Sequence, residues 1–181
     1  MRIIGGEHGG RKFNPPNKMP YTRPTTDIAK EGLFNVLQHK LDFENLKTLD
    51  LFGGTGNISY ELASRGVTDL TIVEKDVRMY EFIKKTAEQL RIENLKTIKL
   101  DVFKFIESCP DKFDFIFAGP PYALTTIDDL PKRIFEKKLL NKEGWFVLEH
   151  TPRNDYKTFP FYRQEKSYGT TVFSIFVESR D

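Results

Sequence analysis

Hydrophobic residues along the chain fall into short continuous runs that are separated by stretches of helical spacing. The runs have the length and composition of β-strands and lie at 46–52, 70–73, 95–100, 113–118 and 145–149. The fourth run, 113–118, is nearly all apolar, which is expected of a strand that is covered on both faces of a sheet.

The segments between and after these runs predict helices and a final hairpin. Residues 57–65, 79–90 and 126–138 are typical of helices, and the apolar positions of 79–90 recur every three or four residues on one face. The end of the chain, 159–178, resembles two extended segments joined at Gly169. Alternating strands and helices with a terminal antiparallel pair predict an α/β fold with a mostly parallel, doubly wound sheet.

The first 25 residues differ from the rest in composition. They contain five Lys or Arg residues against one acid, with four of the 12 glycines and four of the 10 prolines. We therefore expect a basic, turn-rich arm at 1–25 and a slightly acidic folded domain at 26–181. This asymmetry suggests an anionic polymer as partner, and a solvated terminus explains it equally well. Thr25 or Thr26 can cap the helix expected at about 26–39.

Length and composition exclude several classes of protein. The 181 residues, 39% hydrophobic and 30% charged, are typical of one soluble domain, and no apolar run approaches the roughly 20 residues of a membrane span. The chain starts without the apolar stretch of a secretory signal, and a single cysteine, Cys109, fits a reducing compartment. His8, His39 and His150 lack metal-ligand spacing. His150 is interpreted as a solvated strand end, and contact with substrate near the active face is the less favoured alternative. We expect a cytoplasmic monomer without a metal.

The first candidate site follows the first predicted strand, because ligands of open parallel sheets bind beyond the carboxyl ends of the strands. There, residues 50–56 read Asp-Leu-Phe-Gly-Gly-Thr-Gly, whose glycines allow close backbone approach and a tight turn. No Lys-Ser or Lys-Thr opens the next helix, so this is not a phosphate-binding P-loop. Gly54-x-Gly56-x-x-Ser59 approaches a dinucleotide fingerprint, but Ser59 replaces its third glycine or alanine. A nicotinamide-dependent oxidoreductase remains a distant alternative.

Acidic residues follow the next two predicted strands. Glu74 comes directly after the second strand, where a carboxylate can accept hydrogen bonds from both ribose hydroxyls. Asp101 ends the third strand and can accept from an adenine amino group. Capping of a helix at 102–108 explains Asp101 equally well, and the two roles are compatible.

The fourth strand ends in Gly119-Pro120-Pro121-Tyr122. Adjacent prolines fix the backbone and remove N–H donors, so the carbonyl groups are left to point at a ligand. Tyr122 offers a rigid face on which a planar base can stack. A stiff loop with a packed tyrosine is the alternative, which the position at a strand end disfavours.

Together these motifs resemble those of the small-subunit ribosomal RNA guanine-N2 methyltransferases, a branch of the S-adenosylmethionine-dependent enzymes. The segments that carry the resemblance are Arg2-Ile3-Ile4-Gly5-Gly6, Gly10-Arg11-Lys12, Arg23-Pro24-Thr25-Thr26-Asp27, Leu33-Phe34-Asn35, Asp50-Leu51-Phe52-Gly53-Gly54-Thr55-Gly56, Ser64-Arg65-Gly66, Val73-Glu74-Lys75-Asp76 and Pro120-Pro121-Tyr122. The glycine loop is generic to methyltransferases, whereas the amino-terminal signature combined with Pro-Pro-Tyr is much more specific. The resemblance implies a Rossmann-like class I methyltransferase fold of seven strands, the last antiparallel, with a basic N-terminal arm or hairpin.

The resemblance also implies roles for particular residues. S-adenosylmethionine is expected to contact Asp50, Phe52, Gly53, Gly54, Thr55, Gly56, Glu74, Lys75, Asp101 and Val102. The catalytic motif corresponds to Gly119, Pro120, Pro121 and Tyr122. Contacts to 16S ribosomal RNA are expected from Arg2, Arg11, Lys12, Lys18 and Arg23. Since so small an arm cannot specify one guanine, the assembled small subunit is a better substrate than naked RNA.

One position departs from the family motif, which has Asp or Asn where this chain has Gly119. The side-chain acceptor for the guanine amino group is then absent, and the carbonyls of Gly119 and Pro120 remain. Losing one preorganised polar contact typically costs about 10²–10³ in rate, so we expect transfer to survive with the Pro120 carbonyl as acceptor. Two alternatives stay open: a noncatalytic RNA-binding assembly factor that kept the fold, and a DNA amino-methyltransferase.

Overall fold

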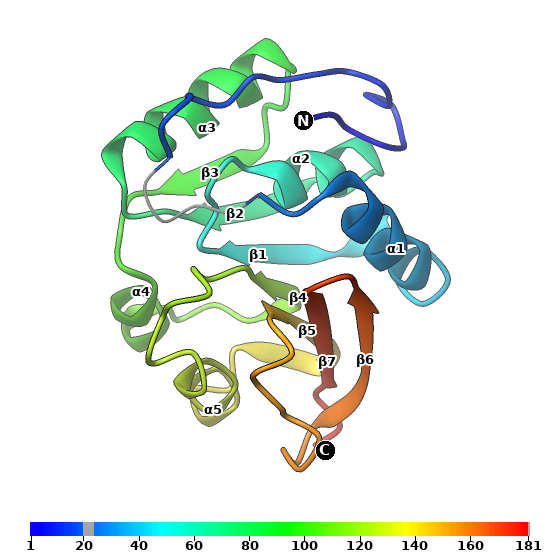
Figure 1. Ribbon diagram of the computed structural model, residues 1–181, viewed down its shortest axis with the longest axis vertical. Coiled ribbons are helices and arrows are strands. Elements are labelled where there is room, and N and C mark those ends of the chain that lie inside the picture. Colours follow the sequence, from blue (N-terminus) through cyan, green and yellow to red (C-terminus); the bar gives the residue numbers. More distant parts are fainter. Residues whose placement is uncertain (20–23, 181) are drawn as a thin grey trace.

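Seven strands form one sheet through the centre of the structure, a computed structural model that describes residues 1–19 and 24–180 (Figure 1). The strands are β1 (Lys47–Leu51), β2 (Asp69–Val73), β3 (Leu95–Ile98), β4 (Phe113–Ala118), β5 (Leu140–His150), β6 (Tyr162–Tyr168) and β7 (Thr171–Val177). Their order across the sheet is β3-β2-β1-β4-β5-β7-β6. Strands β1 to β5 are parallel, and β7 lies antiparallel between β5 and β6. The expected sheet, mostly parallel with its last strand reversed, is confirmed.

The helices occupy the connections in which helical spacing was found. They are α1 (Asp27–Gln38), α2 (Asn57–Ser64), α3 (Val77–Gln89), α4 (Val102–Ser108) and α5 (Asp129–Glu136), with a 3-10 turn η1 (Phe43–Asn45) after α1. Thr26 caps α1 by accepting a hydrogen bond from the Ala29 N–H at 3.2 Å. Helix α5 is shorter than the expected 126–138, because residues 126–128 and 137–138 form turns at its two ends. Pro131 lies in the first turn of α5, where its missing N–H needs no partner within the helix.

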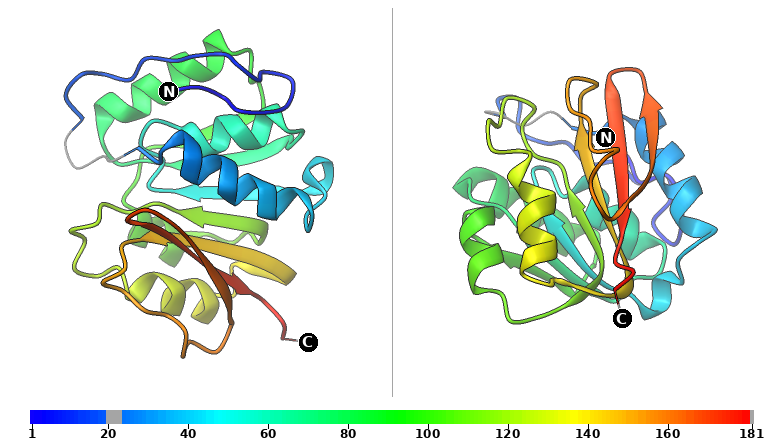
Figure 2. Two further views of the ribbon diagram at one scale, coloured as in Figure 1. Left: turned by 45° about the vertical axis from the view of Figure 1, so that its right-hand side comes forward. Right: turned by 90° about the horizontal axis from the view of Figure 1, so that it is seen from below.

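Two hydrophobic cores cover the two faces of the sheet. Helices α1 and α2 pack on one face, where β4 contributes Phe115 and Phe117. Helices α4 and α5 pack on the other face, where β4 contributes Ile116 and Ala118. Alternate residues of a strand point to opposite faces, so the nearly all-apolar sequence of β4 follows from its burial on both sides. Figure 2 shows α1 and α5 on opposite sides of the sheet.

The amino-terminal residues 1–13 fold back on themselves and dock on α2 and the end of α3 (Figure 1). An antiparallel bridge joins Arg2 to Lys12, and the N–H of Ile3 donates to the carbonyl oxygen of Arg11 at 2.9 Å. Ile3 and Phe13 are buried with Tyr60 and Leu90 in a third small core. This apolar contact gives the strip a fixed position on the domain.

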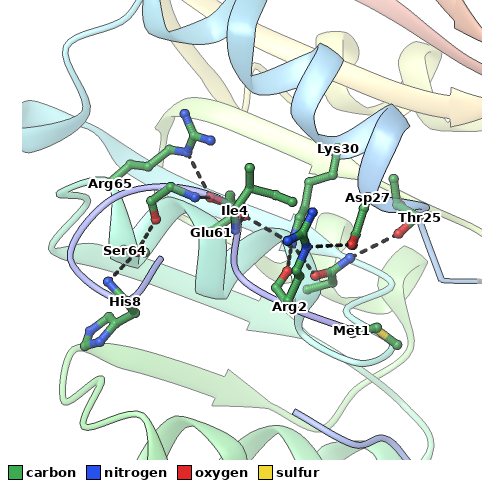
Figure 3. Close-up of polar contacts among 12 residues, drawn as sticks. Met1, Arg2, Ile4, His8, Thr25, Asp27, Lys30, Glu61, Ser64 and Arg65 are labelled. Atoms are coloured by element: carbon green, nitrogen blue, oxygen red, sulfur yellow. Dashed lines mark hydrogen bonds and ion pairs between the residues drawn. The ribbon is translucent and has the colours of Figure 1, made fainter. Parts of the chain in front are cut away.

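A buried ion pair lies beneath this strip (Figure 3). The ammonium of Lys30 in α1 is 3.1 Å from the Oε1 of Glu61 in α2, and both side chains are fully buried. Glu61 also accepts hydrogen bonds from the N–H groups of Ile4 at 2.8 Å and Gly5 at 2.9 Å, while Lys30 donates to the carbonyl oxygen of Arg2 at 2.6 Å. The pair therefore holds the amino-terminal backbone, not its side chains.

Candidate active site

A cavity of about 600 Å³ opens at the carboxyl ends of the parallel strands. Its walls come from the segments that follow β1, β2, β3 and β4 and from the end of β5. Backbone hydrogen bonds tie two of these segments to neighbouring strands: Gly53 donates to Val73 at 2.9 Å, and Gly119 donates to Leu51 at 3.3 Å. The sheet thus fixes the walls of the cavity directly.

The glycine loop after β1 forms one wall. Its lining residues are Phe52, Gly53, Gly54 and Thr55. A side chain at Gly53 cannot fit, because its Cβ would lie 2.4 Å from Cγ1 of Ile72. Gly56 is not among the lining residues; its φ is +81°, and a Cβ there would lie 2.3 Å from the Tyr60 ring. The loop's glycines therefore serve packing beneath the cavity as well as backbone approach from within it.

Glu74 follows β2 and lines the cavity in direct contact with the glycine loop. Its carboxylate accepts hydrogen bonds from the N–H of Gly54 at 2.7 Å and from the N–H of Asp76 at 3.0 Å. Lys75 lines the cavity beside it. The side chain of Glu74 is thus oriented by backbone donors from two loops, which places it where a ribose-binding carboxylate is expected.

Asp101 follows β3 and takes part in two features at once. It caps α4, since its Oδ1 accepts from the N–H groups of Phe103 at 3.0 Å and Lys104 at 3.2 Å. It also lines the cavity together with Val102. Both cap bonds end on the same oxygen atom, so capping and cavity lining are compatible, as the sequence indicated.

Asp50 lies at the bottom of the cavity and is nearly fully buried. Its Oδ2 accepts a hydrogen bond from the hydroxyl of Ser59 at 2.8 Å. Burial raises the pKa of Asp50 to about 7, and the hydrogen bond from Ser59 offsets part of that effect. Ser59, the residue that breaks the dinucleotide fingerprint, thus has a structural task that a glycine or alanine could not perform.

The corner after β4 forms the opposite wall, with Gly119, Pro120 and Pro121 lining the cavity. Tyr122 is half-buried and is not among the lining residues. Its hydroxyl lies 3.5 Å from the Oε2 of Glu149 and 3.4 Å from the hydroxyl of Thr171. These contacts hold the Tyr122 hydroxyl beside Glu149, which lines the cavity, and stacking on a base stays a prediction.

Glu149 is the cavity residue that sequence reasoning missed. It lies next to the end of β5, is 3% exposed and lines the cavity. The hydroxyl of Thr25, another lining residue, donates to its Oε1 at 2.5 Å. The sequence does contain a signal for Glu149, because this acidic residue ends a predicted strand just as Asp101 does.

His150 is a correction, because it is not a solvated strand end. His150 is the last residue of β5, and its side chain is completely buried. Its Nδ1 lies 2.7 Å from the carbonyl oxygen of Thr151, and its Nε2 lies 2.7 Å from the hydroxyl of Ser174. Burial lowers the pKa of His150, so the imidazole is neutral, donating to the carbonyl through Nδ1 and accepting from Ser174. The strand end is buried because β7 and the following loop cover it.

The basic residues expected to contact RNA lie on the surface in so far as the structure describes them. Arg2, Arg11, Lys12 and Lys18 are exposed, and Arg23 lies outside the described residues. The side chains of Arg2 and Arg11 also make contacts within the protein. Arg2 forms a 3.0 Å ion pair with Asp27, and Arg11 donates to backbone carbonyl groups at the end of α3.

Residues 1–19 and 24–180 contain neither a candidate membrane span nor a cluster of metal-ligating side chains. No helix there is long and apolar enough to cross a membrane. No group of three or more His, Cys, Asp or Glu side chains is arranged to hold a metal ion there.

Comparison with known proteins adds a family and several relatives. The model of the family described as Conserved hypothetical protein 95 matches residues 1–177. Ribosomal RNA small subunit methyltransferase D of Escherichia coli K12 is 26% identical over 179 residues, which are 97% of this chain and 89% of that protein. The solved structure of yhhF from Escherichia coli is 25% identical, with a TM-score of 0.87 and coverage of 100% and 99% of the two chains. An RNA methyltransferase from Salinibacter ruber, solved with S-adenosyl-L-homocysteine, shares the fold at 15% identity, with a TM-score of 0.70 over 88% of this chain and 95% of that one.

Proposed function

This chain belongs to the family described as Conserved hypothetical protein 95, and from that premise we propose that it methylates the exocyclic N2 of a guanine in 16S ribosomal RNA. It is an S-adenosylmethionine-dependent RNA methyltransferase, as its relatives and the shared fold indicate. Ribosomal RNA of the small subunit is the class of substrate that the name of the Escherichia coli relative gives for that protein.

S-adenosylmethionine fits the cavity by size, charge and polarity. The cofactor carries a sulfonium and an ammonium group, and the cavity is lined by the carboxyl groups of Asp50, Glu74 and Asp101. Val77 and Val102 add apolar surface suited to an adenine ring. When bound, the cofactor supplies an electrophilic methyl group. The residues of this chain have to hold it and bring the guanine to it.

The observation that carries the proposal is that the Gly119-Pro120-Pro121 corner and the glycine loop line the same cavity. The amino nitrogen of guanine is a poor nucleophile because its lone pair is delocalised into the ring. The site must extrude the base, align the nitrogen with the methyl group and accept the amino hydrogens, so that the lone pair turns outward. Prolines have no N–H, so this corner offers acceptors without competing donors. We assign the acceptor role to the Pro120 carbonyl and base stacking to Tyr122.

RNA binding is assigned to the basic amino-terminal residues. Arg2, Arg11, Lys12 and Lys18 lie exposed on the docked strip and the segment after it, and such contacts position phosphates without reading sequence. Specificity for one guanine then has to come from the shape of a folded particle. Binding is expected to weaken steeply as the salt concentration rises.

Single-turnover methyl transfer to unmodified small subunits tests the proposal, with naked 16S RNA and duplex DNA as parallel substrates. Mass spectrometry of the digested RNA should reveal N2-methylguanosine, formed faster on subunits than on naked RNA. Binding of the subunit without methyl transfer above background would favour the noncatalytic assembly factor. Methylation of DNA alone would favour the DNA amino-methyltransferase.

A further inference from the structure

We propose that Glu149 is a catalytic residue, whose carboxylate accepts a hydrogen bond from the guanine amino group in the space beside Gly119. The inference rests on the proposed function and deepens it, since it names a side chain for a task that the backbone of the Pro-Pro corner would otherwise carry alone.

The position of Glu149 is the first argument. A Cβ placed on Gly119 would lie 3.9 Å from the Oε2 of Glu149. A carboxylate or amide carried by residue 119 would therefore project into the space that Glu149 borders. Strand β5 lies next to β4 in the sheet, so the ends of the two strands bring a carboxylate and the corner together.

The orientation of Glu149 is the second argument. The Thr25 hydroxyl donates to Oε1 at 2.5 Å, which directs Oε2 toward Gly119 and the Tyr122 hydroxyl. Thr25 is itself held, because its carbonyl oxygen accepts from the side-chain amide of Asn57 at 3.2 Å, and Asn57 accepts from Lys30 at 2.8 Å. Figure 3 shows Thr25 and Lys30 in this network. A carboxylate held by such a network is preorganised for its role.

The other carboxyl groups of the cavity have different tasks. Asp50 binds the Ser59 hydroxyl, and Glu74 binds backbone N–H groups of the loops after β1 and β2. Asp76 caps α3, and Asp101 caps α4. Asp50 lies in β1, Glu74 follows β2 and Asp101 follows β3. Among the described lining residues, Glu149 is therefore the carboxylate that lies beside the Pro-Pro corner.

The chemical step balances with Glu149 in this role. The nitrogen lone pair forms the new C–N bond, and the electron pair of the S–CH₃ bond stays on sulfur as a neutral thioether. The nitrogen then carries a positive charge and loses one hydrogen as a proton. The carboxylate of Glu149 is placed to take this proton and pass it to solvent.

The test compares Glu149→Gln with wild-type protein on small subunits under single-turnover conditions. Glutamine cannot take up a proton as the carboxylate does, and with its carbonyl accepting from the Thr25 hydroxyl its NH₂ group points at the base, where an acceptor is required. We expect the methyl-transfer rate to fall about 10²–10³-fold, with S-adenosylmethionine affinity within about threefold of wild type by calorimetry. Glu143→Gln, an exposed substitution near the other end of β5, is the matched control and should change neither.

A rescue separates a catalytic role from a structural one. Gly119→Asp combined with Glu149→Gln returns a carboxylate to the same space, and we expect at least a tenfold recovery of the rate. The new Cβ would lie 3.0 Å from Cε1 of Phe117, so the ring has to shift slightly, and Gly119→Asn in the same background is the second rescue. In the wild-type background Gly119→Asp adds a second carboxylate beside Glu149, so no gain is expected.

The outcomes distinguish this inference from the proposed function. A wild-type rate in Glu149→Gln overturns the inference while the function stands. A loss that neither rescue restores, or a parallel loss of cofactor affinity, assigns Glu149 a structural role and also overturns it. Absence of N2-methylguanosine with the wild-type protein overturns the proposed function, and the inference with it.

Discussion

Replacing Lys30 by Met should destabilise the protein more than most single substitutions do. The side chain is completely buried, and its ammonium donates to the Arg2 carbonyl oxygen and the Asn57 side chain while pairing with Glu61 (Figure 3). Methionine fills nearly the same volume, so the substitution removes the charge without opening a cavity. What remains is a buried carboxylate that has lost its main counter-charge.

The size of the effect follows from the remaining partners of Glu61. Burial by itself would raise the pKa of Glu61, but hydrogen bonds from Ile4 and Gly5, with the nearby charge of Lys30, outweigh it and hold the pKa below its usual value. Breaking one member of such a pair costs about 3–5 kcal/mol. Arg65, 2.9 Å from Glu61, keeps part of the charge balance and favours the lower end of that range. In a domain of this size, that free energy lowers Tm by roughly 6–20 °C.

Urea unfolding of wild type and Lys30→Met, analysed for midpoint and slope, measures the loss. Hydrogen exchange should show the largest loss of protection in residues 1–13, whose backbone the pair holds. The control is Arg2→Ala, which removes an ion pair that is about half exposed and should cost only about 0–1 kcal/mol. A loss below about 1 kcal/mol in Lys30→Met would refute the reasoning, because breaking a buried ion pair is expected to cost about 3–5 kcal/mol.

Three further predictions concern the cavity and the packing. Glu74→Ala should weaken S-adenosylmethionine binding about tenfold or more by calorimetry, because it removes the charged acceptor expected to bind the ribose, which two backbone N–H groups hold in place. Binding of the cationic cofactor favours ionised Asp50, whose pKa burial raises to about 7, so affinity should rise with pH through about 7 and fall up to about tenfold per unit below it. Gly32→Ala should destabilise the fold by about 1–3 kcal/mol in urea, because its Cβ would lie 2.1 Å from the Tyr168 ring.

A different outcome would contradict each of these predictions. Unchanged affinity in Glu74→Ala would remove Glu74 from the cofactor site. A pH slope that persists in Asp50→Asn would come from another group. An alanine at position 32 that leaves the unfolding midpoint unchanged would mean that the Tyr168 ring swings away without cost.

Much of the fold follows from local sequence signals, and particular elements show why. Strand β4 was predicted with its observed bounds, because a short, nearly all-apolar run that ends at Gly119-Pro120 is typical of a strand buried on both faces. The start of α1 followed from Thr26, whose hydroxyl caps the helix. Strand β5 was predicted too short, because its first residues, from Leu140, are mixed in polarity and pair with β4 around an irregularity near Phe113.

The position of the candidate site was also predictable, because parallel strands deliver their following residues to one edge of the sheet. Glu74, Asp101 and Pro120 all line the observed cavity. The partners of these side chains were not predictable, since hydrogen bonds such as that between Asp50 and Ser59 depend on how a helix faces a strand. The Lys30–Glu61 pair was hidden for the same reason: each charge alone is typical of an exposed helix face.

The docked amino terminus and the cavity belong to one hydrogen-bonded network. Glu61 holds the backbone of the amino-terminal strip and pairs with Lys30, Lys30 donates to Asn57, and Asn57 donates to the Thr25 carbonyl oxygen. Thr25 then binds Glu149 beside the Pro-Pro corner. A basic segment proposed to meet RNA is thus connected, through buried and partly buried groups, to the carboxylate proposed to meet the base. An unpaired buried polar group costs free energy. A residue of this network can therefore move only if its hydrogen-bond partners move with it, which favours a site that is already assembled before RNA binds.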